Sequence, residues 1–428
     1  MKRFVTLLLP LGLLAHTLPE ILHHVDQNGL LEAKKYEVLA KKRLYEVQKA
    51  KNLFSIDASL QGIWLHETPT MSLHLSLPDM PPLPSKFQAA AKEQYTGELA
   101  ISYPLFTGFA ITNLIEKSKL DMVKTRLEKR DLKRRLYLKA DALYGQIYAL
   151  EHTKRALHKA LQAMELSYRK AKGFYKQGLI PLSDLKNIES KRYEIEAKLQ
   201  EIKAATSSLY QELGYLSGQK IQSIDGLPDI ELPKNLDVTK RADVLALKKA
   251  LAMDRKDVAL AKSALYPKLF VKGALRGYGD DLSLSGDGYR NGDQSYAAVQ
   301  MRYNLFNGFG DKAKIEAARA KLLAKRSFLD DYIKRARTQL RSDQLTLRAL
   351  ESKRVWAKKR VEAARSYYEL IKGRYDNQLS SADELSRSIA SLAEARAQLA
   401  GVRSRIFVQK CKIALQVSLE HFVKELGL

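Results

Sequence analysis

The residues that could support catalysis or bind a metal are few in this chain and are poorly spaced for either task. None of its eight histidines lies three or four positions from another, the spacing at which a helix presents two imidazoles to one metal ion. The single cysteine, Cys411, can form neither an internal disulfide nor a thiolate cluster. The chain also contains no glycine-rich phosphate loop and no nucleophile elbow. We therefore predict no enzymatic activity, no cofactor and no metal site.

The charge of the chain suggests a polyanionic partner at first sight. Its 428 residues include 73 lysines and arginines against 48 aspartates and glutamates, a net charge of +25. The basic residues, however, are interleaved with acidic ones along the whole chain, and no basic segment rich in aromatic residues stands out. The sequence therefore argues against a nucleic acid as partner.

The amino terminus is typical of an exported protein. Lys2 and Arg3 precede the apolar run 4–15, which is too short to cross a bilayer, since a spanning helix takes about 20 residues. We predict a signal peptide over residues 1–15, and a buried amino-terminal helix is the alternative. No later apolar run is long enough for a membrane helix, so any entry into a membrane has to use strands.

The chain repeats itself at an offset of 200 residues. The segment 103–109 (YPLFTGF) recurs at 303–309 (YNLFNGF), and 172–175 (KGFY) recurs at 372–375 (KGRY). One constant offset through separate landmarks indicates a structural repeat. The predicted parts are a signal peptide at 1–15, a first repeat at 16–219, an equatorial linker at 220–239 and a second repeat at 240–428.

Two very long helices are predicted between these landmarks. Residues 312–372 contain neither glycine nor proline, and residues 110–172 contain only Gly145. Their apolar side chains follow alternating spacings of three and four, the pattern of a coiled-coil seam. A polar break and a further amphipathic segment follow each one, so we expect antiparallel helical hairpins at about 108–217 and 308–426.

Both seams are interrupted at the same place in the repeat, by Lys154 and by Arg354. A long basic side chain can lie along an apolar surface and still keep its charge in water. We interpret both residues as cations that reach solvent from the edge of the seam.

Upstream of each helical hairpin the apolar period changes to two, which predicts strand hairpins at about 53–106 and 267–306. Four strands cannot close a barrel and leave open edges, whereas several copies of the chain could close one with apolar side chains outward. An ordinary half-buried sheet is the alternative that the period allows. The residues expected to face a barrel lumen are Lys268, Lys272, Arg276, Gln300 and Arg302.

A strand hairpin followed by a long helical hairpin, twice in one chain, resembles the outer-membrane efflux protein (TolC) family. The resemblance is carried by the strand-to-helix junctions 103–108 and 303–308 and by the turns 175–178 and 375–378, and it covers nearly the whole chain after the signal peptide. It implies a mainly helical fold with a small membrane β part. The helical hairpins form a coiled-coil tunnel, and a homotrimer shares a barrel of twelve strands, four from each chain.

The resemblance also implies a function. Members are exit ducts of tripartite efflux pumps that export small molecules or metal ions, located in the bacterial outer membrane with a periplasmic helical tunnel. The implied partners are two further copies of the chain, a periplasmic adaptor (membrane fusion) protein, an inner-membrane transporter and outer-membrane lipid. A duct for type I protein secretion is the alternative, and a periplasmic coiled-coil scaffold outside the membrane is a more distant one.

Finally, the resemblance implies where such a duct closes. In the family the hairpin turns converge at the periplasmic tip, where a tyrosine and acidic residues hold the pore shut. The tyrosine corresponds to Tyr375, the first acidic position to Glu384 with Asp383 beside it, and the second to Arg387, a departure from the family pattern. We expect the acidic pair either to attract cations into a narrow pore or simply to stabilise the first turn of a helix. The turn residues expected to dock the adaptor are Gln177, Gly178, Leu179, Asn377, Gln378 and Leu379.

Overall fold

The computed structural model describes residues 15–72 and 86–428, so the predicted signal peptide lies almost entirely outside the described part. The chain divides into two compact units. The helical unit comprises the described residues of Met1–Glu37 together with Arg126–Leu247 and Leu329–Leu428. The strand unit comprises the described residues of Val38–Thr125 together with Lys248–Phe328. Each unit takes segments from both halves of the chain.

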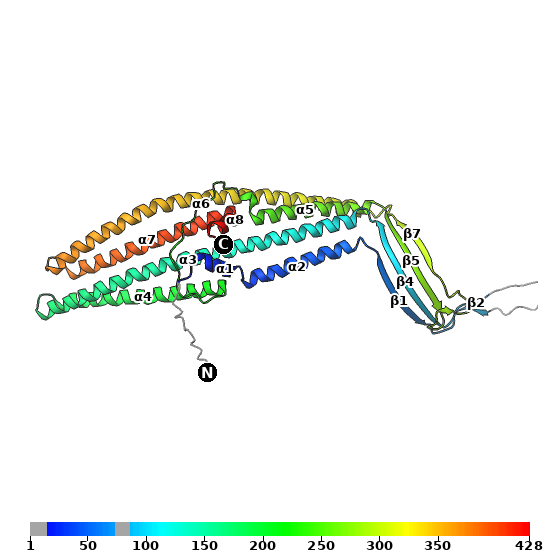
Figure 1. Ribbon diagram of the computed structural model, residues 1–428, viewed down its shortest axis with the longest axis horizontal. Helices are drawn as coiled ribbons and strands as arrows, with labels where there is room; N and C mark the ends of the chain where they lie inside the picture. The colour runs from blue at the N-terminus through cyan, green and yellow to red at the C-terminus, as the bar shows by residue number, and fades with distance from the viewer. Residues whose placement is uncertain (1–14, 73–85) are drawn as a thin grey trace, which may run out of the picture. The chain divides into compact units, whose positions relative to one another are not determined.

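Long helices dominate the chain, and their ends repeat the offset seen in the sequence (Figure 1). Helices α3 and α6 have 67 residues each, and α4 and α7 have 36 each. In both pairs the second helix begins and ends 200 positions after the first. The helices are α1 (Leu18–Val25), α2 (Gly29–Ala50), α3 (Ala110–Lys176), α4 (Leu182–Ser217), α5 (Ala242–Lys262), α6 (Gly310–Asp376), α7 (Ala382–Val417) and α8 (Leu419–Glu425), with the short 3₁₀ helices η1 (Val238–Lys240) and η2 (Ser263–Leu265).

The last helix differs from the expected one. The predicted second hairpin continues to about residue 426, whereas the structure ends α7 at Val417. Ser418 adopts an extended backbone, and its hydroxyl accepts a hydrogen bond from the backbone N–H of His421, so that it caps the separate helix α8. Serine caps helices well but also occurs inside them, which is why the pattern alone did not predict this break.

The core of the helical unit follows the predicted seams. Leu136, Ala140, Leu143 and Ile147 of α3 are buried in one apolar cluster with residues of α1, α4, α7 and α8. A second cluster joins the ends of α3 and α6 to the beginnings of α4 and α7. Each fully buried leucine or isoleucine contributes about 1.5–3 kcal/mol of transfer free energy, so these clusters hold the hairpins together. In the part of the chain that the structure describes, none of the helices has the length and the apolar character that crossing a membrane takes.

In the strand unit, four antiparallel strands pair in the order β1 (Ser55–Trp64), β4 (Glu93–Phe106), β5 (Lys268–Gly279), β7 (Tyr296–Arg302) (Figure 1). A short fifth strand of the same sheet pairs parallel with the end of β5. The four expected strands are therefore confirmed to within a few residues. The central pair, β4 and β5, joins the two halves of the chain. The connecting segments carry the short strands β2 (Thr70–Ser72), β3 (Lys86–Gln88) and β6 (Ser285–Gly286).

The two faces of this sheet differ in chemistry. The registers Ile56↔Ile101, Leu99↔Leu275 and Val271↔Val299 place aliphatic side chains on one face, and these are exposed in the single chain. The registers Glu98↔Arg276 and Lys268↔Arg302 place charged side chains on the other face. The two-residue period of the sequence thus separates an apolar face from a polar face, as expected for adjacent antiparallel strands.

The strand-to-helix junctions explain one of the repeated sequence landmarks. Gly108 and Phe109 have φ of 62° and 66°, and Gly308 and Phe309 have φ of 66° and 65°. A Cβ atom on Gly108 would lie 2.7 Å from the carbonyl oxygen of Ser263, so a glycine is required there. The same left-handed pair therefore turns the chain from strand to helix in both repeats.

Candidate functional site

The two hairpin turns expected at the periplasmic tip have the same backbone geometry. In both, a left-handed residue lies two positions after the end of the first helix, Gly178 with φ 73° and Gln378 with φ 62°. The backbone N–H of Leu179 donates to the carbonyl of Phe174 at 2.9 Å, and that of Leu379 donates to the carbonyl of Arg374 at 2.8 Å, as in a Schellman motif.

The six turn residues predicted to dock an adaptor all lie in these two turns, and Leu179 and Leu379 expose about half and two-thirds of their surface. Each turn thus presents an unpartnered leucine at its end. The repeated geometry means that one partner surface could engage both turns.

Tyr375 lies in the core of the tip rather than on its surface. It is buried among apolar residues of α3, α4, α6 and α7, and its ring meets that of Phe174 edge-on at 6.0 Å. Burial, and then the neighbouring carboxylates Asp376 and Asp184, raise the pKa of Tyr375. Its hydroxyl has no hydrogen-bond partner among the described residues. In the single chain this tyrosine therefore packs the two hairpins together and keeps one unused hydrogen-bonding group.

The acidic pair lies in the first turn of α7, and each carboxylate has a local partner. Ser381 caps the helix by accepting from the backbone N–H of Glu384 at 3.1 Å. The carboxylate of Glu384 accepts a hydrogen bond from the hydroxyl of Ser380, and Asp383 pairs with Arg387 one turn later. The two carboxylates therefore stabilise the first turn of α7 in the single chain. Arg387, which stands at the second acidic position of the family pattern, reduces the negative charge at this point.

An ion pair joins the two hairpins near the tip. The ammonium of Lys170 on α3 lies 2.5 Å from a carboxylate oxygen of Asp376, the last residue of α6. Both side chains are partly exposed, so the pair contributes at most about 1 kcal/mol. Such a contact can be broken and re-formed at little cost when hairpins move.

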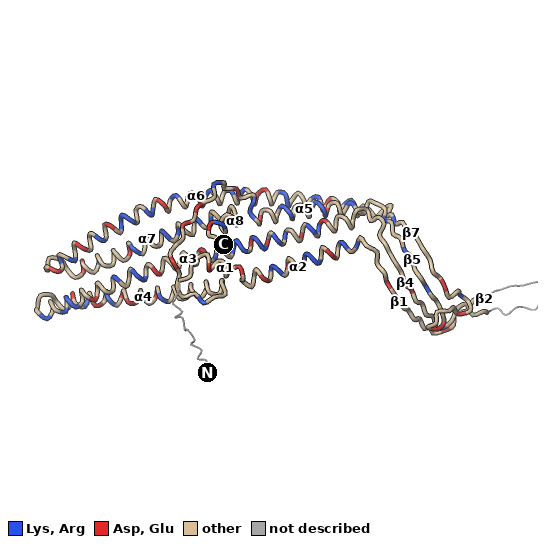
Figure 2. The backbone as a smooth tube through the Cα atoms, viewed as in Figure 1, with Lys and Arg blue, Asp and Glu red and all other residues tan. Residues whose placement is uncertain are grey.

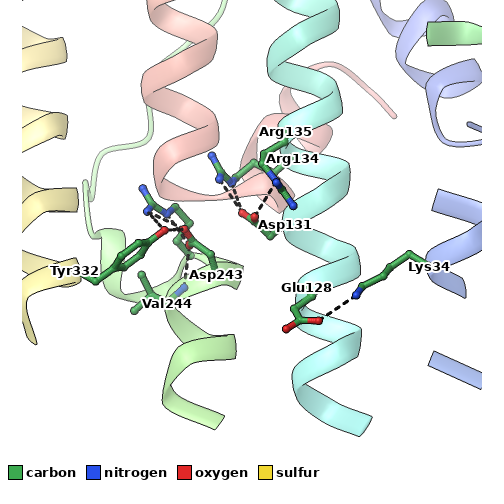
Figure 3. A network of polar contacts seen from close by, with 9 residues as sticks. Lys34, Glu128, Asp131, Arg134, Arg135, Asp243, Val244 and Tyr332 are labelled. Atoms are coloured by element: carbon green, nitrogen blue, oxygen red, sulfur yellow. Dashed lines mark hydrogen bonds and ion pairs between the residues drawn. The ribbon is translucent and has the colours of Figure 1, made fainter. Parts of the chain in front are cut away.

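At the other end of the helical unit, a polar network fixes the start of α5 against α6 (Figure 3). The guanidinium of Arg241 donates to both carboxylate oxygens of Asp243 at 2.7 and 2.8 Å, and the hydroxyl of Tyr332 donates to the same carboxylate at 2.6 Å. Burial raises the pKa of Asp243, but the hydrogen bonds from Arg241 and Tyr332 outweigh it and lower that pKa overall. The bidentate pair is a strong, geometrically specific contact.

Figure 3 also shows two contacts of α3 in the same region. Lys34 reaches Glu128 at 3.0 Å, while Asp131 pairs with Arg134 and Arg135 of its own helix. The first contact ties α2 to α3, and the second lies within α3.

The polar face of the sheet gathers all five lumen candidates, since Lys268, Lys272, Arg276, Gln300 and Arg302 share it by register. An acidic residue that the site prediction did not include lies among them. Glu98 on β4 binds Lys272 at 2.7 Å and lies 3.9 Å from Arg276. The face is therefore of mixed charge. The two-residue alternation of β4 places Glu98 on this face. The contact between Glu98 and Lys272 joins residues 174 positions apart, so the sequence alone could not predict it.

The distribution of charge over the helices agrees with the interleaving seen in the sequence. Lys and Arg lie along the helices of both units, with Asp and Glu between them (Figure 2). Within residues 15–72 and 86–428, no group of three or more His, Cys, Asp or Glu side chains has the arrangement of a metal site.

Comparison with known proteins gives one family and several structures. The sequence model of the outer membrane efflux protein family matches residues 238–410. The solved transmembrane channel CusC superposes with a TM-score of 0.81 at 13% identity, over 95% of this chain and 93% of that one. The outer membrane protein VceC of Vibrio cholerae gives 0.77 at 16% identity, over 96% of both chains. The outer membrane channel CmeC of Campylobacter jejuni gives 0.79 at 14% identity, over 94% of this chain and 85% of that one.

No curated protein matches the chain by sequence. The structural matches nevertheless extend over nearly the whole length of the chain and of the solved channels. They confirm the expected fold class, long helical hairpins together with a four-stranded contribution to a β structure.

Proposed function

Because the model of the outer membrane efflux protein family matches residues 238–410 and the fold is that of solved outer membrane channels, we propose that this chain belongs to that family and is the exit duct of a tripartite efflux pump. It resides in the outer membrane, and its helical hairpins form the periplasmic tunnel of such channels. The family and the fold are those of channels, and we propose that the chain catalyses no reaction.

The observation that carries the proposal is the sheet β1-β4-β5-β7. Its apolar face exposes aliphatic side chains such as Leu60, Leu275 and Val299, each about two-thirds exposed or more. A contiguous apolar face of this kind is unfavourable in water and favourable against lipid. Its outer strands, β1 and β7, each have an unpaired edge in the single chain.

Joining three copies edge to edge removes every open edge and turns the apolar face outward toward lipid. The polar face, with Lys268, Lys272 and Glu98, then lines a water-filled lumen. The homotrimer and the lumen residues are thus parts of one proposal, since neither arrangement is stable without the other.

At the periplasmic end we propose that the tip both docks the adaptor and closes the pore. The exposed leucines of the two turns offer small apolar contacts of repeated geometry to a periplasmic adaptor protein. Asp383, Glu384 and Arg387 then form the constriction, with Arg387 partly neutralising the ring of carboxylates. Tyr375 contributes to closure from the core of the tip, where it packs the two hairpins together. The inner-membrane transporter selects the cargo, a small molecule or metal ion, and the duct passes it.

Membrane fractionation tests this function against a periplasmic scaffold. If the chain is an outer-membrane duct, it should be recovered with the outer membrane. In a detergent gel it should migrate as a trimer without heating and as a monomer after boiling. Recovery in the soluble periplasmic fraction, with heat-independent migration, would contradict it. The matched control is a variant that lacks the residues of β7 (Tyr296–Arg302). It has no strand at one edge of the sheet and is expected to migrate as a monomer with or without heating.

A further inference from the structure

The two cations that interrupt the helical seams line the same cavity in the helical unit. The cavity has a volume of about 860 Å³, and its walls come from α3, α4, α6, α7 and the linker segment 222–229. Lys154 and Arg354 occupy equivalent positions in the two repeats, and both reach this space. We call it the linker cavity. Its size lies within the range of small-molecule sites.

The linker cavity carries an excess of positive charge. Six lysines and arginines line it, against the three carboxylates of Glu151, Asp225 and Asp229. The basic residues are Lys154, Arg155, Arg354, Lys358, Arg403 and Lys410.

Only two of these cations are paired within the cavity. Lys154 lies 2.8 Å from Glu151, and Lys410 lies 2.7 Å from Asp229. Among the described residues, no carboxylate lies within ion-pair distance of the other four, Arg155, Arg354, Lys358 and Arg403. Like charges gathered in one concave space repel one another unless an anion is present, and the concave shape concentrates their field.

Hydrogen bonds hold the linker wall of the cavity in place. The hydroxyl of Tyr144, a fully buried residue, donates to the carbonyl oxygens of Asp225 and Gly226 at 3.1 and 3.0 Å. These bonds fix the linker where it borders the cavity. Ile406 and Phe407 are buried beneath it, so its floor is apolar.

His152 adds a neutral polar group to the lining. Its ring lies against that of Tyr148 at a centroid distance of 4.2 Å. Burial, and then the nearby Arg155 and Arg403, lower the pKa of His152, so that it is uncharged at neutral pH and can still donate or accept a hydrogen bond. A neutral donor beside several cations suits an anion with more than one oxygen.

We propose that the linker cavity is a binding site for a small multivalent anion bearing phosphate or carboxylate groups. Arginine guanidinium groups bind such oxygens in pairs, and three arginines from three different helices, Arg155, Arg354 and Arg403, line this space. The site does not depend on the pump role, because it is formed within the helical unit of one chain and shares no residue with the tip or lumen candidates.

The test is calorimetric titration of the purified full-length trimer in detergent with inorganic pyrophosphate, with citrate and acetate in parallel. The proposal predicts saturable binding of pyrophosphate or citrate, one per chain, with acetate much weaker. Affinity should fall as salt rises, because the basic side chains at the rim are exposed. Pyrophosphate binding alone identifies a phosphate site, and citrate binding alone identifies a carboxylate site.

Two neighbouring lysines provide a matched pair of variants. Lys358 lines the cavity, whereas Lys359 is exposed, pairs with Glu362 at 2.9 Å and does not line it. Lys358→Gln should weaken binding several-fold and Arg354→Gln with Arg403→Gln about tenfold or more, while Lys359→Gln leaves binding unchanged. Since Lys358 is exposed on a helix surface, its variant remains informative even where the double variant does not assemble.

Two outcomes would overturn the proposal. The first is no saturable binding of either multivalent anion, and the second is an equal loss of binding in Lys358→Gln and Lys359→Gln. Where neither anion binds and Lys358→Gln also lowers the dissociation temperature of the trimer, a neighbouring copy of the chain, not a free anion, neutralises the cavity.

Discussion

Asp343 on α6 provides the sharpest test of how the second helical hairpin is held together. It is 4% exposed. Its carboxylate accepts hydrogen bonds from the ammonium of Lys412 at 2.8 Å and the amide of Gln416 at 2.7 Å, both on α7. Gln339 of its own helix adds a third at 3.2 Å. Asp343→Asn removes the negative charge and places an amide N–H₂ among donors.

The expected cost follows from these contacts. Removing one partner of a fully buried ion pair costs about 3–5 kcal/mol. Lys412 is partly exposed and can turn toward water, so we expect about 2–3 kcal/mol here. For a chain of this length the unfolding entropy corresponds to roughly 1 °C in Tm for each kcal/mol, which predicts a decrease of about 2–3 °C. The assay is thermal unfolding of the purified protein followed by far-UV circular dichroism.

The matched control is Asp331→Asn, which removes the carboxylate of an exposed pair with Arg335 on the same helix. Exposed pairs contribute about 0–1 kcal/mol, so its Tm should fall by at most about 1 °C. Equal Tm values for the two variants at neutral pH would refute the assignment of Asp343 as a buried clamp.

The effect of Asp343 should depend on pH in one direction. Burial raises the pKa of Asp343, but hydrogen bonds from Lys412 and Gln416 outweigh it and lower that pKa overall. A carboxyl whose folded-state pKa is lowered contributes stability above its unfolded pKa, near 3.9, and loses it as the pH falls through the folded value. The Tm difference between wild type and Asp343→Asn should therefore be full at pH 7 and shrink below about pH 4. A difference that widens on acidification would contradict this.

Three further predictions concern the tip and the lumen. Arg387→Gln removes the partner of Asp383, so the cation-to-anion permeability ratio should rise by about twofold or more, while Asp383→Ala with Glu384→Ala should lower it. Reversal potentials in a salt gradient measure both, and unchanged selectivity in both would exclude these residues from the constriction. Glu98→Gln frees Lys272 and Arg276 and should shift permeability toward anions, whereas a shift toward cations would place the polar face outside the lumen. Gln378→Gly replaces a non-glycine residue of positive φ and should stabilise the protein by about 1 kcal/mol, whereas Gly178→Ala should destabilise it by a similar amount. The same thermal assay measures both variants. Negligible effects of both would show that the turns are unstrained.

Periodicity was sufficient to predict the elements of this fold. The apolar period changes from two to spacings of three and four where the sheet ends and α3 begins. At that junction Gly108 and Phe109 adopt positive φ and turn the chain from strand to helix. The offset of 200 residues then placed α6 and α7 from α3 and α4. The break at Ser418 was missed, since a serine inside an amphipathic segment carries no unique signal, and so were the short strands β2, β3 and β6 of the connecting segments.

Contacts between distant segments could not be predicted in the same way. The pairing of Glu98 with Lys272 requires β4 to lie beside β5, and a single sequence gives no register between strands from different repeats. The linker cavity is a similar case, because Lys154 and Arg354 were recognised only as interruptions of two seams. Their convergence with Arg403 depends on how three helices pack. Tyr375 was placed at the tip by resemblance, while its burial against Phe174 became visible only in the structure.

Single-channel recording tests the central claim most directly. Purified trimer added to one side of a planar lipid bilayer should insert and give discrete, uniform conductance steps, with the steps abolished when the sample is boiled to monomer first. Insertion without conductance, or no insertion at any protein concentration at which the trimer is intact, would contradict the account of this chain as an outer-membrane duct.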